Sequence, residues 1–143
     1  WYDERASCMP LVTMDFEFCV SACGTRIVPY QIGACTLESN LKFDRLMRMG
    51  EPVRKCVTAP EVDDAWLQSH GAVSPESAMQ AFVAWLAHIP RAKFGVVLLA
   101  HNAFSADAFL LAELLRRVDL AELLADDRPR YAGAAKPSHT HLK

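Results

Sequence analysis

Apolar and polar positions in the first third of the chain predict three β-strands. Residues 11–18 are mostly apolar, aromatic or β-branched, which predicts a buried strand. Residues 26–37 and 41–47 predict a second and a third strand, and turn-forming residues at 21–24 and 38–40 separate the three. Links this short join antiparallel neighbours, so we expect the three strands to form a meander.

The middle of the chain predicts an irregular segment followed by one amphipathic helix. Residues 50–71 are rich in Pro and Asp and predict irregular structure. Ser74, Pro75 and Glu76 then form a helix start, with a capping hydroxyl, a proline at the first helical position and an acid in the first turn. The positions that follow at helical spacing are apolar: Met79, Phe82, Val83 and Leu86. Pro90 is expected to end this helix.

A later apolar run predicts a strand that returns to the sheet. Residues 96–100 are continuously apolar, which is typical of a central strand covered on both faces. After a long crossover helix, this strand is expected to lie parallel to the first strand. Ser105 is expected to cap a second helix, whose apolar positions are Leu110, Leu111, Leu114, Leu115 and Val118. Residues 119–124 predict a further helical piece, and residues 126–143 a loop or tail.

The predicted order is β-β-β-α-β-α, which indicates an α/β fold with a mixed sheet and helices packed on it. A length of 143 residues suits one domain, so we expect a single domain over residues 1–143 with its core at 11–124. No closing element follows the last predicted helix. We therefore expect the domain to be truncated at its C-terminal end.

Composition excludes some classes of protein. A net charge of −2 excludes a uniformly basic protein that coats nucleic acid, but not an enzyme that uses metal ions at a strand end. No apolar run is long enough to cross a membrane, and no signal peptide is visible. Five cysteines without a disulfide framework indicate a reducing, intracellular compartment. Cys19 and Cys23 leave a zinc site open as an alternative, although no second pair follows at ligand spacing.

Asp15 and Glu17 are two carboxylates within an otherwise apolar predicted strand. Side chains two apart on a strand project from the same face, so these two groups repel each other and resist desolvation. No Lys or Arg lies within the strand, and a bound divalent cation would account for the pair. The alternative is an exposed edge strand with an acidic polar face.

A second polar group follows the apolar run at 96–100. His101 and Asn102 come at the end of that strand, and Asp107 falls in the first turn of the next helix. The carboxyl end of a strand is the usual place for a site in an open α/β sheet. The alternatives are ordinary helix capping by Asp107 and a hydrogen-bonded core histidine at position 101.

Taken together, these segments resemble the DEDD (DEDDh, ribonuclease T-like) 3′→5′ exonuclease superfamily, in particular the three-prime repair exonucleases and the proofreading subunits of polymerases. The matching segments are residues 11–18, 31–34, 69–71 and 98–114. In the family an Asp-x-Glu strand precedes a Gln-Ile-Gly or Gln-Ile-Ala strand, and a His-Asn motif followed by Asp comes later. The resemblance covers residues 11–118 and implies a ribonuclease H-like fold.

The resemblance also implies a two-metal phosphodiesterase. Asp15, Glu17 and Asp107 would hold two Mg²⁺ or Mn²⁺ ions. The enzyme would act on the 3′ end of single-stranded DNA or RNA and release nucleoside 5′-monophosphates. His139 would be the general base, and the fourth carboxylate would then come directly after Lys143. The alternative for this last segment is a flexible polar tail.

Phe16, Phe18, His101 and Asn102 are the expected substrate contacts. Phe18 would stack on a base, as aromatic rings do on single strands, or would simply extend the strand. His101 and Asn102 would shape the end of the later strand. The chain departs from the family after Glu17, because the family commonly has a turn there that grips the terminal nucleotide. Two other functions therefore stay open: a non-catalytic exonuclease-like module that binds nucleic acid or protein, and a different metal-dependent hydrolase with endonuclease products.

Overall fold

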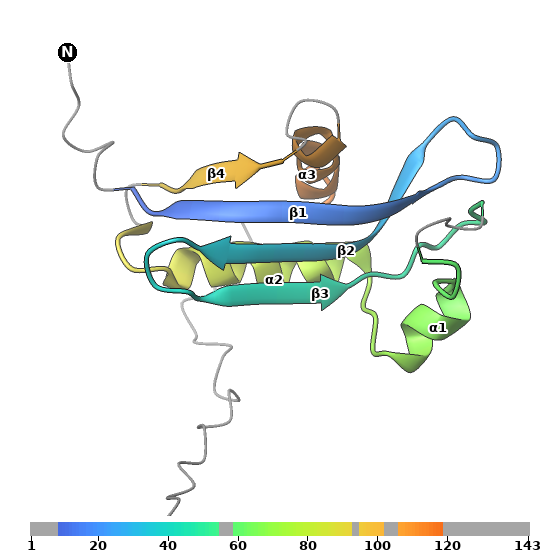
Figure 1. Cartoon of the computed structure of the whole chain (residues 1–143), viewed down its shortest axis with the longest axis horizontal. Helices are drawn as coiled ribbons and strands as arrows, with labels where there is room; N and C mark the ends of the chain where they lie inside the picture. The colour runs from blue at the N-terminus through green and yellow to red at the C-terminus, as the bar shows by residue number, and fades with distance from the viewer. Residues whose placement is uncertain (1–8, 55–58, 93–94, 102–105, 119–143) are drawn as a thin grey trace, which may run out of the picture.

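The computed structural model describes residues 9–54, 59–92, 95–101 and 106–118, which form one mixed sheet with helices (Figure 1). The strands are β1 (Leu11–Val20), β2 (Ile27–Thr36), β3 (Lys42–Leu46) and β4 (Val97–Ala100). The helices are α1 (Asp64–Ser69), α2 (Pro75–His88) and α3 (Ala108–Leu115). The strand order is β3-β2-β1-β4, so β1 lies between β2 and β4.

β1 extends well beyond its parallel neighbour β4, and this difference in length leaves part of one edge of β1 open. β1 pairs with β2 in antiparallel fashion along nearly its whole length, ending with Val20 opposite Ile27. β4 pairs with β1 in parallel, and its last residue, Ala100, lies opposite Met14. Beyond Met14, no described strand pairs with β1 on the β4 side. The predicted meander and the predicted parallel return of the later strand are both confirmed.

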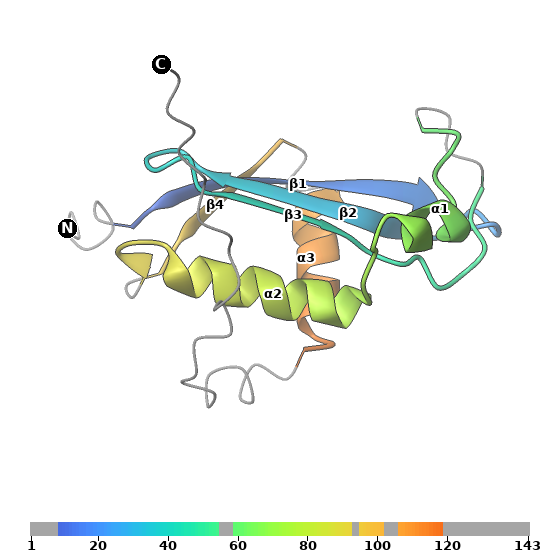
Figure 2. The same cartoon turned by 90° about the horizontal axis from the view of Figure 1, so that it is seen from below.

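α2 and α3 lie on the same face of the sheet (Figure 2). Alternate side chains of β1 point toward this face, as strand geometry requires. The buried core contains Val12, Met14, Phe16, Ile32, Met79, Phe82, Leu110 and Leu114, among others. The opposite face carries the polar residues of β1, and no described helix covers it.

The aromatic contacts of α2 fix this helix beneath β3. The ring centroids of Phe43 and Phe82 are 5.3 Å apart, and those of Phe43 and Trp85 are 5.7 Å apart. Such tilted pairs add to the stabilisation that burial itself provides. The helix starts as predicted, because the Ser74 hydroxyl accepts a hydrogen bond from the backbone N–H of Ser77 at 3.1 Å.

The structure corrects the expectation that residues 50–71 are wholly irregular. Residues Asp64–Ser69 form α1, so the element order is β-β-β-α-α-β-α. The Asp63 carboxylate caps α1 by accepting a hydrogen bond from the Trp66 backbone N–H at 2.7 Å. Leu67 anchors the helix in a second core cluster, which also contains Cys19, Val28, Tyr30, Met49 and Val62.

The expectation of a central strand at 96–100 is wrong for the described sheet. β4 lies at the edge of this sheet, and its side chains are not covered on both faces. Val97 is 37% exposed and Leu99 is 42% exposed, since both lie on the face away from α2 and α3. A continuous apolar run indicates burial on two faces, but the described residues provide cover for only one.

Several predicted features lie outside the described residues. These are Asn102, Ser105, the helical piece at 119–124, and the tail at 126–143 with His139. Within the part of the chain that the structure describes, no helix combines the length and the apolar character that crossing a bilayer requires.

Candidate functional site

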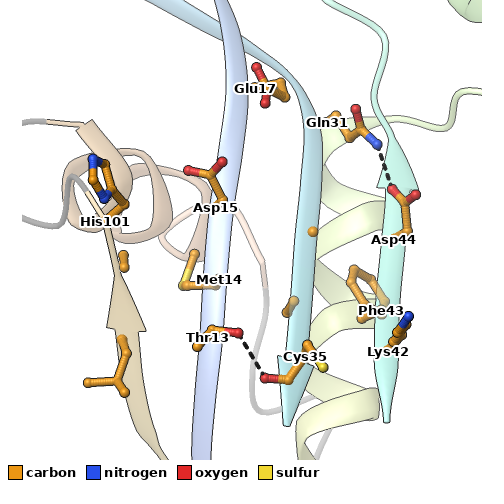
Figure 3. Close-up of a pocket in the computed structure, with 14 residues that line it drawn as sticks. Thr13, Met14, Asp15, Glu17, Gln31, Cys35, Lys42, Phe43, Asp44 and His101 are labelled. Atoms are coloured by element: carbon orange, nitrogen blue, oxygen red, sulfur yellow. Dashed lines mark hydrogen bonds between the residues drawn. The ribbon is translucent and has the colours of Figure 1, made fainter. Parts of the chain in front are cut away.

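Asp15 and Glu17 project from the face of the sheet that no described helix covers, which we call the open face (Figure 3). Their spacing along β1 predicts this shared direction. Both are exposed, whereas Phe16 between them is 3% exposed and packs in the core beneath the sheet. A register shift between Glu17 and Phe18 interrupts the pairing of β1 with β2 directly after the second carboxylate. The two carboxylates therefore lie immediately before this irregularity of the strand, and the pairing resumes at Phe18.

Asp107 brings a third carboxylate to the same stretch of β1. It directly precedes α3, it is 1% exposed, and its Oδ1 accepts a hydrogen bond from the backbone N–H of Phe16 at 3.2 Å. β4 has ended opposite Met14, so it supplies no carbonyl to this N–H, and a buried N–H needs an acceptor. Asp107 thus reaches the residue between Asp15 and Glu17, across 91 positions of the sequence.

The chemistry of the three carboxylates fits a hard divalent cation, since Mg²⁺ and Mn²⁺ prefer oxygen ligands. Their positions differ, because Asp15 and Glu17 are exposed on the open face and Asp107 is buried at the strand edge. Within the described ranges, no three His, Cys, Asp or Glu side chains converge closely enough to hold one ion. The fold therefore gathers three carboxylates in one neighbourhood without closing them into a single cage.

The open face of the sheet forms a broad hollow of about 670 Å³ beside the carboxylates (Figure 3). Its floor follows one cross-strand row, since Asp15 pairs with Gly33 and Gly33 pairs with Asp44. A Cβ atom added at Gly33 would meet no atom within 4 Å, so this position is open space. The other lining residues are Thr13, Met14, Glu17, Gln31, Ala34, Cys35, Lys42, Phe43, Leu99, Ala100 and His101.

Asp44 is a polar residue of the hollow that the sequence reasoning did not single out. Its Oδ1 accepts a hydrogen bond from Gln31 Nε2 at 2.9 Å, and the two side chains meet across neighbouring strands (Figure 3). The signal in the sequence is the alternation of β3, where Lys42 and Asp44 flank the buried Phe43. That alternation gives the face but not the distance to Asp15, which depends on the order of the strands.

Of the other predicted site residues, some lie in the core, one lines the hollow, and two lie outside the described residues. The ring of Phe16 lies in the core on the helix-covered face, so it faces away from the hollow. Phe18 is half-buried and packs against the same core. His101 is exposed and lines the hollow at the end of β4. Asn102 and His139 lie outside the described residues.

No protein-family model matches this chain, and no curated protein matches it. A mixed α/β sheet hosts many unrelated activities, so the architecture by itself assigns none of them.

The hollow is acidic, which constrains what it could bind. Three carboxylates line it, those of Asp15, Glu17 and Asp44. The basic residues of the lining are Lys42 and His101. A phosphodiester placed there would meet net repulsion unless cations neutralised the carboxylates. The site is therefore suited to a ligand that brings a divalent cation, or to a ligand that offers hydrogen-bond donors.

Proposed function

We propose that this chain is a ribonuclease H-like exonuclease domain of the DEDD superfamily, which hydrolyses single-stranded DNA or RNA from its 3′ end. The observation that carries the proposal is the hydrogen bond between Asp107 and the Phe16 N–H. It supports the resemblance because the Asp of the His-Asn-x4-Asp motif lies beside the Asp-x-Glu motif in space.

Asp15, Glu17 and Asp107 would hold two Mg²⁺ or Mn²⁺ ions. Such ions, if bound, would neutralise the phosphate, activate a water molecule and stabilise the leaving 3′ oxygen. The chain itself fixes the carboxylates, since β1 sets the spacing of the first two and the Phe16 N–H orients the third. Gly33 leaves room on the floor of the hollow for the terminal nucleotide, and the product would be a nucleoside 5′-monophosphate.

We further propose that the protein works in a reducing, intracellular compartment. Cys23 and Cys35 are free thiols, and Cys23 is exposed at the turn after β1. Disulfides form and persist in oxidising compartments, where exposed thiols of this kind are uncommon.

The test is cleavage of a labelled single strand of about 12 nucleotides, a length in the range that single-strand sites occupy. The unaltered full chain is expected to release mononucleotides only when Mg²⁺ or Mn²⁺ is present. Asp15→Asn should lower the rate by more than about 100-fold, because even the neighbours of metal ligands commonly contribute 10- to 100-fold. Glu113→Gln is the matched control, since this exposed carboxylate of α3 lies outside the hollow. Internal fragments instead of mononucleotides would indicate a different metal-dependent hydrolase.

A non-catalytic binding module is the second candidate. The observation in its favour is that no three potential ligands converge on one point among the described residues. Calorimetric titration with Mn²⁺ separates the two functions. Binding of two Mn²⁺ ions together with cleavage supports the exonuclease. Binding of single strands supports the module if neither cleavage nor the binding of two Mn²⁺ ions is observed.

A further inference from the structure

On the side of the hollow away from Asp15, the lining includes another carboxylate, that of Asp44. Asp44 lies two strands away, and Gly33 between them contributes no side chain. Neighbouring strands are about 4.8 Å apart, so the backbones that carry the two carboxylates are about 10 Å apart. A gap of this width, open down to the sheet at Gly33, accommodates the sugar or base of one nucleotide.

Asp44 is oriented rather than free. Gln31 Nε2 donates a hydrogen bond to its Oδ1 at 2.9 Å, and both residues lie on the open face (Figure 3). This bond occupies one carboxylate oxygen and leaves the second with its acceptor capacity. A carboxylate held in this way is a fixed acceptor on the open face, on the strand that pairs with Gly33.

The charge of Asp44 determines which part of a nucleotide can lie against it. A phosphate would be repelled at this distance, because among the described residues no cation is ion-paired to the Asp44 carboxylate. The nearby Arg45 guanidinium donates its hydrogen bond to the backbone oxygen of Asp44 instead, at 2.9 Å. A neutral hydrogen-bond donor would instead be attracted, since hydrogen bonds to a charged acceptor are among the stronger ones. Such donors on a nucleotide are the sugar hydroxyls and the N–H groups of the base edge.

We propose that Gly33 and Asp44 form a nucleotide subsite, in which Gly33 provides the space and Asp44 accepts a hydrogen bond from a sugar hydroxyl or a base N–H of the terminal nucleotide. Gln31 is a positioning residue that acts through Asp44. The subsite rests on the proposed function, because it takes the scissile phosphate to lie at Asp15 and Glu17. It makes Asp44 a determinant of which 3′ ends are degraded.

The test compares substrates that differ in a single donor on the terminal nucleotide. One pair differs in the 2′-hydroxyl, and another differs in an exocyclic amino group of the base. Asp44→Asn retains the shape and an oxygen for Gln31, but it replaces the free acceptor by an NH₂ donor. This variant is expected to lose about 10- to 100-fold in kcat/KM for the substrate with the recognised donor, and far less for its partner without it.

The pair that shows the effect identifies the source of the donor, and either pair supports the subsite. Gln31→Leu should shift the same ratio in the same direction, while Glu113→Gln should leave it unchanged. An equal effect of Asp44→Asn on all substrates, or no effect on any, overturns the proposal. The melting temperature of each variant checks that the sheet is intact.

Failure of the proposed function would be seen separately. If the unaltered chain cleaves nothing, the subsite is tested by binding of nucleoside 5′-monophosphates in the presence of Mn²⁺. The nucleoside 5′-monophosphates are compared in pairs that differ in the 2′-hydroxyl or in the exocyclic amino group. If Asp44→Asn weakens binding of only one member of such a pair, the result supports the subsite even without cleavage. Absence of binding, or binding that Asp44→Asn leaves unchanged, overturns it.

Discussion

Replacing Asp107 by asparagine and by alanine separates two roles of this side chain. Its Oδ1 accepts the hydrogen bond of the Phe16 N–H, and the residue is 1% exposed. Alanine leaves that N–H without its acceptor, which costs about 1–3 kcal/mol in a buried position. Asparagine keeps an amide oxygen in place, so its cost should stay within about 1 kcal/mol.

These free energies convert into measurable shifts of the melting temperature. The entropy of unfolding is about 2.1 cal/mol/K per residue, which for 143 residues gives about 0.3 kcal/mol/K. A loss of about 2 kcal/mol therefore lowers the melting temperature by about 7 °C. We expect Asp107→Ala to melt about 3–10 °C below the unaltered chain, and Asp107→Asn to melt less than about 3 °C below it.

The metal-dependent part of the experiment addresses the second role. A cation at 100 times its dissociation constant raises the stability of the folded state by about 2.7 kcal/mol, or about 9 °C on the same scale. Calorimetry with and without Mn²⁺ should show this rise for the unaltered chain and for Glu113→Gln. Both Asp107 variants should lose most of the rise, and both should lose cleavage activity.

Two results would refute this reasoning. Equal melting temperatures for Asp107→Ala and Asp107→Asn would mean that the bond to Phe16 contributes no stability. A full Mn²⁺-dependent rise and full cleavage in Asp107→Asn would mean that Asp107 is not a metal ligand.

Three further predictions concern the floor of the hollow, the core and an exposed thiol. Gly33→Val should leave the melting temperature within about 3 °C, since a Cβ there meets nothing, but it should lower kcat/KM by filling the hollow; unchanged kinetics would contradict this. Phe82→Ala should destabilise the fold by about 3–5 kcal/mol in urea denaturation, because the 1% exposed ring packs on Phe43 and Trp85. Hydrogen bonds from Ser21 and Thr25 lower the pKa of Cys23 from 9.0 to about 7, so alkylation by iodoacetamide should reach half its maximal rate near pH 7. Because the pKa is lowered, Ser21→Ala should move that midpoint to higher pH.

Rules that involve only neighbouring residues were sufficient to predict most strands of the sheet. They were also sufficient to predict the shared face of one pair of carboxylates. Strand alternation has a period of two residues, so it places Asp15 and Glu17 on one face whatever the partner strands are. Ser74 and Pro75 likewise mark the start of α2, because capping depends only on the adjacent turn. Asp63 could have marked α1 by the same rule, but the short helix lacks the repeated apolar spacing that would have drawn attention to it.

The order of the strands and the lining of the hollow depend on contacts between segments that are distant in the sequence. The apolar run at 96–100 has the composition of a central strand, yet β4 lies at the edge of the described sheet, since strand order is a property of the whole topology. Asp44 faces the hollow across Gly33 only because β2 lies between β1 and β3.

The strands of the meander, the main helix and the shared face of Asp15 and Glu17 follow from the amino-acid sequence, because each depends on neighbours a few residues apart. The position of Asp107 against Phe16 follows instead from the way the strands and α3 assemble. That contact depends on β4 ending opposite Met14, which leaves one N–H of β1 for a side chain to satisfy.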